Sequence, residues 1–368
     1  MVESFPKEPP SLLYLTFNQD SSCFAIGTES GFSIYNSVPY KDSFERNMNG
    51  GIGIIEMLNR CNILALVGGG KNPKYAKNKV AIWDDHQGKV ISELRFNSEV
   101  RNVKLTRDKI FVVCDQKIFI FAFISFENID TIETSDNIKG LISVSTDSST
   151  CIVAFPDKTV GGICVKNYDN NGTLVTINAH QSALACFTLN ANGTLLATTS
   201  EKGTLIRIFN TTDGTFIKEL RRGSENAEIY SLAFDPVGKY LACTSDRKTV
   251  HVFLLGLLQK GNKIEVDQSE KEEVKKTTSV FGKISGFFGV ENNYLNSERS
   301  FAQFKINDNK AICSFGPDNS IVVISSEGKY YQFEFNAKNG ETMLLQDKDI
   351  LKGSSCGKGS GREGDVVG

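Results

Sequence analysis

Two stretches of the sequence, 183–204 and 228–249, superpose at a constant offset of 45 residues, with Gly193 matching Gly238. Each copy has the pattern of an alternating strand, a glycine-containing turn, a second strand, a tight polar turn and the start of a third strand. An internal repeat of several strands with a period of about 40–45 residues restricts the fold more than any other feature of the sequence. It predicts an array of small antiparallel sheets and a chain that is almost entirely β-structure.

Weaker copies of the same pattern occur along the rest of the chain. Together with the two strong copies they make seven, at residues 12–36, 53–83, 100–123, 141–165, 183–204, 228–249 and 301–335. Seven copies suit a closed ring in which every sheet packs against two neighbours and few strand edges stay exposed. We therefore expect an all-β, seven-bladed β-propeller of degenerate WD40-like repeats, forming a single domain over residues 1–352. The repeats are degenerate because the chain has only one tryptophan, Trp83.

Two segments interrupt the repeat. Residues 255–300 are far longer than an ordinary connection between strands, and loops of that length are usually functional or disordered. They fall where the third strand of the sixth blade should lead into the fourth. Residues 353–368 begin with a Gly/Ser-rich run and are expected to form a disordered tail.

Composition narrows the class of protein. The 41 basic and 43 acidic residues give a net charge of −2, which argues against general nucleic-acid binding. No apolar run is long enough to cross a membrane, and the first residues have no apolar signal core. The nine cysteines form no C-x-x-C pair and lie mostly in apolar segments, so they indicate buried free thiols. We expect a cytoplasmic protein.

An arginine pair, Arg221 and Arg222, lies between the two strong copies. Successive side chains of an extended chain point to opposite sides, so each arginine can serve a separate pocket on either flank of one strand. A guanidinium is a planar fork of donors that matches phosphate and keeps its charge. The pair therefore indicates two anion-binding sites.

The repeat also places hydroxyl and imidazole donors around these arginines. One copy offers Ser200, Thr204 and Arg207, and the matching copy offers Ser245, Thr249 and His251; His180 precedes the first copy. Such donors can surround phosphate oxygens. The alternative is that the hydroxyls bond their own turns and the arginines form a solvated edge. The duplication of the whole arrangement favours binding.

With these residues in place, the sequence resembles the PROPPIN family, seven-bladed β-propellers that bind phosphoinositides and act in autophagy and endosomal membrane traffic. The family's Phe-Arg-Arg-Gly motif stands here at 220–223, with leucine at the first position. That leucine should face the packed interior. Other matching stretches are 17–23, 65–70, 78–85, 179–180, 200–204 and 249–253.

The resemblance implies two rim sites at the fifth and sixth blades, for phosphatidylinositol 3-phosphate and the 3,5-bisphosphate. The first would use His180, Ser200, Thr204, Arg207 and Arg221. The second would use Arg222, Ser245, Thr249 and His251. The resemblance also implies peripheral attachment to autophagosomal, endosomal or vacuolar membranes, and autophagy proteins as partners.

The long segment contains a candidate membrane contact. Phe281, Ile284, Phe287 and Phe288 fall on one face at helical spacing, while three nearby glycines disfavour a helix in water. Folding at a lipid interface would bury the phenylalanines at about 1.5–3 kcal/mol each. The alternative is that these side chains pack back on the propeller. A similar membrane-inserting loop occurs in the family.

Other residue clusters carry weaker signals. Asp84, Asp85 and His86 look like a catalytic group, but they also mark the ordinary end of a blade strand. The run 68–71 lacks the spacing of a phosphate-binding nucleotide loop. Without a nucleophile–base pair or a metal-ligand spacing, we expect no enzymatic activity, no cofactor and no metal. The alternative function is a WD-repeat interaction scaffold in which the arginine pair binds an acidic peptide.

Overall fold

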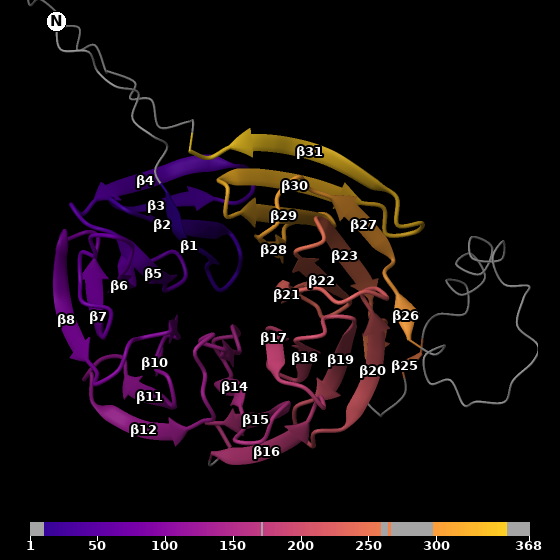
Figure 1. Ribbon diagram of the computed structural model, residues 1–368, viewed down its shortest axis with the longest axis horizontal. Helices are drawn as coiled ribbons and strands as arrows, with labels where there is room; N and C mark the ends of the chain where they lie inside the picture. The colour runs from indigo at the N-terminus through magenta and orange to yellow at the C-terminus, as the bar shows by residue number, and fades with distance from the viewer. Residues whose placement is uncertain (1–10, 171, 259–263, 266–296, 352–368) are drawn as a thin grey trace, which may run out of the picture.

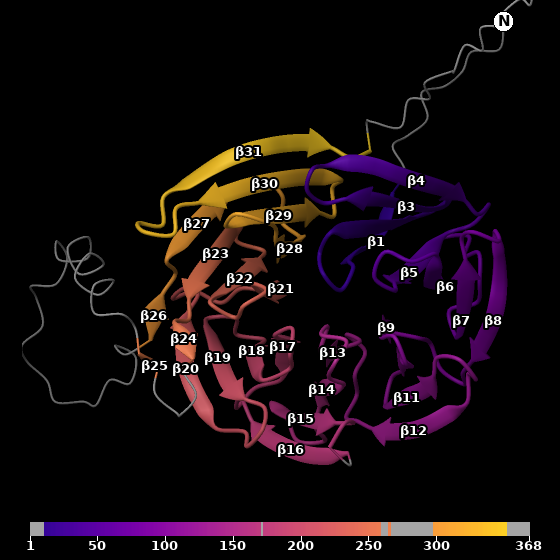
Figure 2. The same cartoon turned by 180° about the vertical axis from the view of Figure 1, so that it is seen from behind.

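The computed structural model describes residues 11–170, 172–258, 264–265 and 297–351. In these residues, seven blades, each with four antiparallel strands, stand around a central channel, with the first strand of each blade beside the channel and the fourth toward the outer rim (Figures 1 and 2). All regular elements of the described chain beyond turns are strands. The predicted seven-bladed β-propeller is confirmed.

The first four blades are each built from four consecutive strands. Their bounds are β1 (Leu12–Phe17), β2 (Cys23–Thr28), β3 (Gly31–Asn36), β4 (Lys41–Asn47); β5 (Ile52–Met57), β6 (Ile63–Gly68), β7 (Lys79–Asp84), β8 (Lys89–Arg95); β9 (Asn102–Leu105), β10 (Lys109–Val113), β11 (Lys117–Ala122), β12 (Asn128–Glu133); β13 (Ser143–Val144), β14 (Ile152–Pro156), β15 (Gly162–Asn167), β16 (Thr173–Asn178).

The last three blades carry the strong repeats and three additional short strands. Their bounds are β17 (Leu184–Leu189), β18 (Leu195–Ser200), β19 (Leu205–Asn210), β20 (Phe216–Arg221); β21 (Ile229–Phe234), β22 (Tyr240–Ser245), β23 (Thr249–Leu254), β27 (Ala302–Lys305); β28 (Ala311–Phe315), β29 (Ser320–Ser325), β30 (Lys329–Phe335), β31 (Thr342–Asp349). The short strands are β24 (Leu257–Leu258), β25 (Ile264–Glu265) and β26 (Glu298–Arg299).

The last predicted repeat needs a correction at its start. Residues 301–335 were expected to form one copy, but β27 is the fourth strand of the sixth blade, where Phe304 pairs with Val250 of β23. The seventh blade begins only at β28. The long segment separates β27 in sequence from β23, the strand with which it pairs. The sequence pattern therefore assigned β27 to the following blade.

Apolar clusters between neighbouring blades hold the ring together. Leu220 of β20, for example, is fully buried in a cluster that also contains Leu232 of β21 and Phe253 of β23. The ring closes in the same way, because Phe24 of the first blade packs with Tyr330 of the seventh. Apolar packing therefore helps to join the first blade to the last, and no described strand belongs to both sheets.

Some predictions concern residues that the structure does not describe. The membrane-insertion residues Phe281, Ile284, Phe287 and Phe288 lie outside the described residues, as do residues 353–368. The division into one domain over 1–352 and a tail stays a prediction. In the described part of the chain, no helix has the length and apolar character needed to cross a membrane.

Candidate functional site

The arginine pair stands where β20 ends at the rim of the fifth blade. Glu219 and Arg221 share one face of β20, and Leu220 and Arg222 share the other, because side chains alternate along a strand. Leu220 packs toward the sixth blade, as expected for the first position of the motif. The opposite face is turned toward the fourth blade, where Phe209 of β19 packs with Val165 of β15. Strand alternation therefore directs the first atoms of the two arginine side chains toward different flanks.

Arg222 is 8% exposed and bonds backbone carbonyls. Its Nε donates to the carbonyl oxygen of Gly203 over 2.8 Å, and its Nη2 donates to the carbonyl oxygen of Glu225. Burial lowers the pKa of the guanidinium from its ordinary value. An arginine in this setting keeps its charge but has few water contacts, which strengthens its attraction for an anion.

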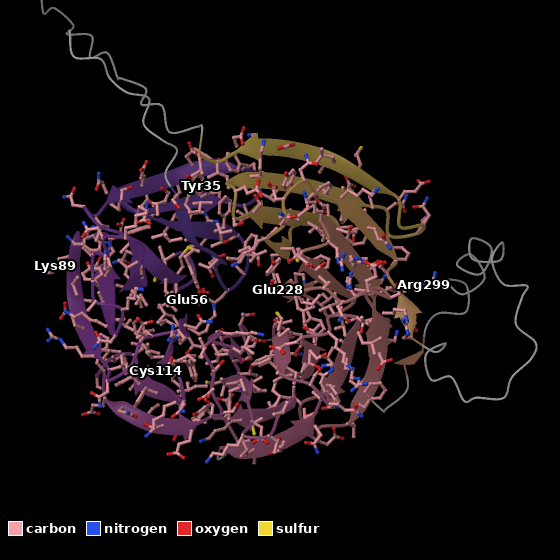
Figure 3. The ribbon with its side chains drawn as sticks, viewed as in Figure 1. Tyr35, Glu56, Lys89, Cys114, Glu228 and Arg299 are labelled. Carbon is pink, nitrogen blue, oxygen red and sulfur yellow. The ribbon has the colours of Figure 1, made fainter. Side chains whose placement is uncertain are left out.

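Arg221 is held by the segment that returns after residue 296. Its Nε donates to Oγ of Ser297 over 3.1 Å. The following residues, Glu298 and Arg299, form β26, which pairs in parallel with the outer edge of β20 and aligns Arg299 with Arg221. Figure 3 shows Arg299 at the outer rim of the ring. A third guanidinium thus joins the arginine pair.

A cavity of about 580 Å³ opens between the end of β20 and the sixth blade. It is lined by Arg221, Arg222, Gly223, Ser224, His251, Arg299, Ser300 and Gln303. Three of these eight residues are arginines and none is acidic, so the lining attracts anions. Both members of the arginine pair line this one cavity, although their described hydrogen bonds point to different partners.

His251 of β23 belongs to the same cavity and is 7% exposed. Its Nδ1 lies 3.2 Å from Oγ of Ser300, and its ring stacks on Phe253. Burial, assisted by the charge of Arg222, lowers the pKa of His251 to about 4. The imidazole is therefore neutral at neutral pH and can donate one hydrogen bond and accept another.

The hydroxyl residues of the predicted second site bond their own turn. Ser245 is buried at the end of β22, and its Oγ accepts from the backbone N–H of Arg247 over 3.3 Å. The Oγ1 of Thr249 donates to the carbonyl oxygen of Arg247 over 3.2 Å. The structure therefore brings Arg222 and His251 together in the cavity, while Ser245 and Thr249 shape the adjacent turn.

Of the predicted first site, His180 and Arg207 form a polar group on the fourth-blade side of β19, whereas Arg221 lines the cavity beside the sixth blade. Arg207 pairs with Glu219 over 3.0 Å and donates to the carbonyl oxygen of Ala179 over 2.7 Å. His180 Nε2 lies 2.9 Å from Oγ1 of Thr198. Burial, assisted by the charge of Arg207, lowers the pKa of His180 to about 4. His180 and Arg207 are therefore close neighbours.

The two hydroxyl residues of that site lie at the turn between β18 and β19. Ser200 is buried at the end of β18. The backbone carbonyl of Thr204 accepts the N–H groups of Arg222 and Gly223, over 2.9 and 3.4 Å. This turn thus holds the backbone of the arginine motif in place.

Sequence reasoning missed four lining residues, Ser224, Arg299, Ser300 and Gln303. Ser224 directly follows the arginine motif and was within reach of the sequence argument. The other three come after the long segment, and only the pairing of β26 with β20 and of β27 with β23 brings them to the cavity. For these three residues, the only signal in the sequence was a basic residue, Arg299, near the end of the long segment 255–300.

The cluster at Asp84 is structural. The carboxylate of Asp84 accepts from Asn62 over 2.6 Å and from the backbone N–H groups of His86 and Gln87, so it closes a turn. Among the described residues, no group of three or more His, Cys, Asp or Glu side chains is placed to hold a metal ion.

Fold and site together define a propeller with a basic, carboxylate-free cavity at its rim, a class suited to anionic ligands. The sequence matches the PROPPIN family over residues 11–351, and the chain belongs to that family. The family is a non-catalytic, lipid-binding type, and membership marks the chain as an autophagy-related, phosphoinositide-binding propeller.

Individual relatives agree with this assignment. Autophagy-related protein 18e of Arabidopsis thaliana is 37% identical over 342 residues, which cover 92% of this chain and 87% of that protein. SVP1-like protein 2 of Pichia angusta is 39% identical, covering 69% of this chain and 72% of that protein. Among solved structures, Kluyveromyces lactis Hsv2 is 26% identical, with a TM-score of 0.73 and coverage of 93% and 99%. KlAtg21, solved with the coiled coil of AgAtg16, is 25% identical, with a TM-score of 0.71 and coverage of 92% and 99%.

Proposed function

We propose that the chain recognises phosphatidylinositol 3-phosphate and phosphatidylinositol 3,5-bisphosphate through its rim at the fifth and sixth blades. The observation that carries this proposal is the cavity beside β20, which three arginines line without a carboxylate. Phosphate groups on an inositol ring need several convergent donors, and guanidinium forks supply them in pairs. His251 adds a further hydrogen-bond donor. Because its ring is neutral at neutral pH, its burial places no additional charge in the cavity.

In this proposal, two separate sites bind phosphoinositide headgroups. Arg222, Ser245, Thr249 and His251 form the second site, and Arg299 supplements it. Binding there leaves the Nε of Arg222 on the Gly203 carbonyl oxygen and exchanges the Glu225 carbonyl partner of Nη2 for a phosphate oxygen. A charged acceptor makes stronger hydrogen bonds than a carbonyl does, so the exchange favours the lipid.

The first site consists of Arg221 with His180, Ser200, Thr204 and Arg207 on the other flank. Arg207 is already paired with Glu219, so it contributes less charge than an unpaired arginine would. We expect the first site to bind more weakly than the second for this reason. Two weak headgroup contacts on one membrane reinforce each other through effective concentration.

The biological setting follows from the family. The protein would act in autophagosome formation and endosomal or vacuolar traffic, attached peripherally to those membranes. Insertion of Phe281, Ile284, Phe287 and Phe288 would add to this attachment. KlAtg21 was solved with a coiled coil of AgAtg16, which supports autophagy proteins as partners of this chain too.

Vesicle flotation with single and double arginine variants tests the proposal. The double substitution Arg221→Ala with Arg222→Ala should abolish 3-phosphoinositide-dependent flotation, and each single substitution should reduce it. The control Arg95→Ala removes an exposed arginine from β8, on another part of the rim. Unchanged flotation of the double variant would remove the lipid proposal and favour an acidic-peptide scaffold. If Arg222→Ala alone abolishes all binding to a soluble headgroup, the proposal of two sites is wrong.

A further inference from the structure

Three consecutive apolar side chains are exposed at the start of the outer strand of the seventh blade. Met343, Leu344 and Leu345 of β31 are 57%, 52% and 42% exposed. Strands at a blade rim ordinarily alternate apolar and polar residues, with the apolar ones packed inward. A continuous exposed run of large apolar residues on a folded protein marks a contact surface.

This run adjoins the arginine-lined cavity. Thr342, which directly precedes Met343, donates its Oγ1 hydrogen to the carbonyl oxygen of Gln303 over 3.3 Å, and Gln303 lines the cavity. Gly340 packs so closely on Phe301 that a Cβ there would overlap the Phe301 carbonyl oxygen. In Figures 1 and 2, β26, β27 and the turn that joins β30 to β31 occupy the same side of the ring. The apolar run therefore begins one residue beyond a contact with the lining of the cavity.

The charged residues around Met343, Leu344 and Leu345 are compatible with contact between this run and a lipid surface. Asp347 and Asp349, further along β31, both pair with Lys329, over 3.8 and 3.0 Å. In the preceding turn, the exposed Lys338 offsets the exposed Glu341. An apolar run with nearly balanced charges beside a cationic cavity has the composition of a shallow membrane contact.

We infer that Met343, Leu344 and Leu345 insert into the lipid–water interface while the cavity holds a phosphorylated headgroup. This inference rests on the proposed lipid function and adds a contact in the seventh blade. The lipid surface is favoured over a partner strand on the edge of β31 because the run is continuous with the proposed headgroup site.

The test compares two ligands. Met343→Ser with Leu344→Ser should weaken binding to phosphatidylcholine vesicles containing phosphatidylinositol 3-phosphate by about tenfold or more. Binding of soluble inositol 1,3-bisphosphate should stay unchanged, because no cavity residue is altered. The control Ile91→Ser removes an apolar side chain of similar exposure, 42%, from β8 on the opposite side of the ring, and should leave vesicle binding unchanged.

A spectroscopic readout reports insertion directly. Leu344→Trp should be quenched by brominated lipids on phosphoinositide vesicles, whereas Ile91→Trp should behave like the wild type, which contains Trp83 alone. Unchanged vesicle affinity of the double serine variant, or absence of quenching at position 344, overturns the inference and indicates a protein partner for β31. If the wild type binds neither soluble headgroup nor vesicle, the proposed function itself has failed, which is a separate result.

Discussion

The Nε of Arg222 donates to the carbonyl oxygen of Gly203, 2.8 Å away, so a turn of the fifth blade sets the orientation of the most buried arginine in the cavity. Gly203 has a φ of +60°, and a Cβ at this position would overlap the carbonyl oxygen of Ala227. The position of the guanidinium thus depends on a residue without a side chain.

We predict that Gly203→Ala both destabilises the fold and weakens headgroup binding. The left-handed backbone and the overlap with Ala227 should lower the free energy of unfolding by about 2 kcal/mol or more. The carbonyl oxygen must then move, and Arg222 moves with it. Urea denaturation and titration with inositol 1,3-bisphosphate measure the two effects. Gly88→Ala is the matched control, since φ there is +63° with no atom within 4 Å, and should cost only about 1 kcal/mol. Equal losses of stability in the two variants would contradict this account.

Stability should fall as the pH is lowered, in part through His251. Burial lowers the pKa of His251 to about 4 from an ordinary value of 6.5, so the folded state prefers the neutral ring. The resulting stability is present above pH 6.5 and is lost as the pH falls toward 4, by up to about 3 kcal/mol.

Denaturation of the wild type and of His251→Asn at pH 7 and pH 5 measures this contribution. We expect the wild type to lose more stability between these pH values than the variant does. Equal slopes would mean that His251 does not titrate as its burial implies. Burial also lowers the pKa of His180 to about 4, so the same comparison of stability at pH 7 and pH 5 can be made with a His180→Asn variant.

Glu56 and Lys104 form an ion pair beside the channel, and we expect the effects of substituting them on the free energy of unfolding to depend strongly on each other. Their charged atoms lie 2.8 Å apart, Glu56 is buried, and Figure 3 places it at the inner side of the second blade. Burial raises the pKa of Glu56, against the opposing effect of the Lys104 charge. Lys104→Met should therefore lower the free energy of unfolding by about 3 kcal/mol, because it leaves a buried carboxylate unpaired.

A double-mutant cycle measured by urea denaturation checks this pair. Glu56→Leu together with Lys104→Met should recover most of the loss, since two apolar side chains replace both charges. The loss from Lys104→Met alone should also shrink at pH 5, where the unpaired Glu56 takes up a proton. Strictly additive effects in the cycle would show that the two residues are independent.

Tyr330 is expected to stabilise the junction between the first and seventh blades. Its hydroxyl donates to the carbonyl oxygen of Ser37 over 2.7 Å, and its ring is fully buried. Tyr330→Phe leaves that carbonyl without its donor and should cost about 1–2 kcal/mol in thermal or urea denaturation. Tyr230→Phe removes a hydrogen bond to the exposed Glu228 and should cost less than about 0.5 kcal/mol. A loss at Tyr330 no larger than the loss at Tyr230 would contradict the stabilising role of the Tyr330 hydrogen bond at this junction.

The repeat made the fold predictable, because glycine turns and alternating apolar residues are local signals. Leu220 was correctly expected in the interior for the same reason, since the strand pattern determines which face it takes. The arginine pair was noticed as two adjacent cations between the two strong copies, and His251 because it closely follows the turn of the second copy. The bonds of Arg207 with Glu219 and of Ser245 with its own turn were not found, because several partners were compatible with the sequence pattern. Arg299 and Gln303 depend on pairings that cross the long segment, and pairings of that kind leave no local pattern.

The junction between the first and seventh blades brings the two ends of the described chain close together. Leu12, near the start of the described chain, and Ile350, near its end, belong to the same apolar cluster, and none of the described strands crosses between the two sheets. A circularly permuted chain, with these ends joined by a short linker and new termini cut into the connection between β12 and β13, should therefore assemble the same ring.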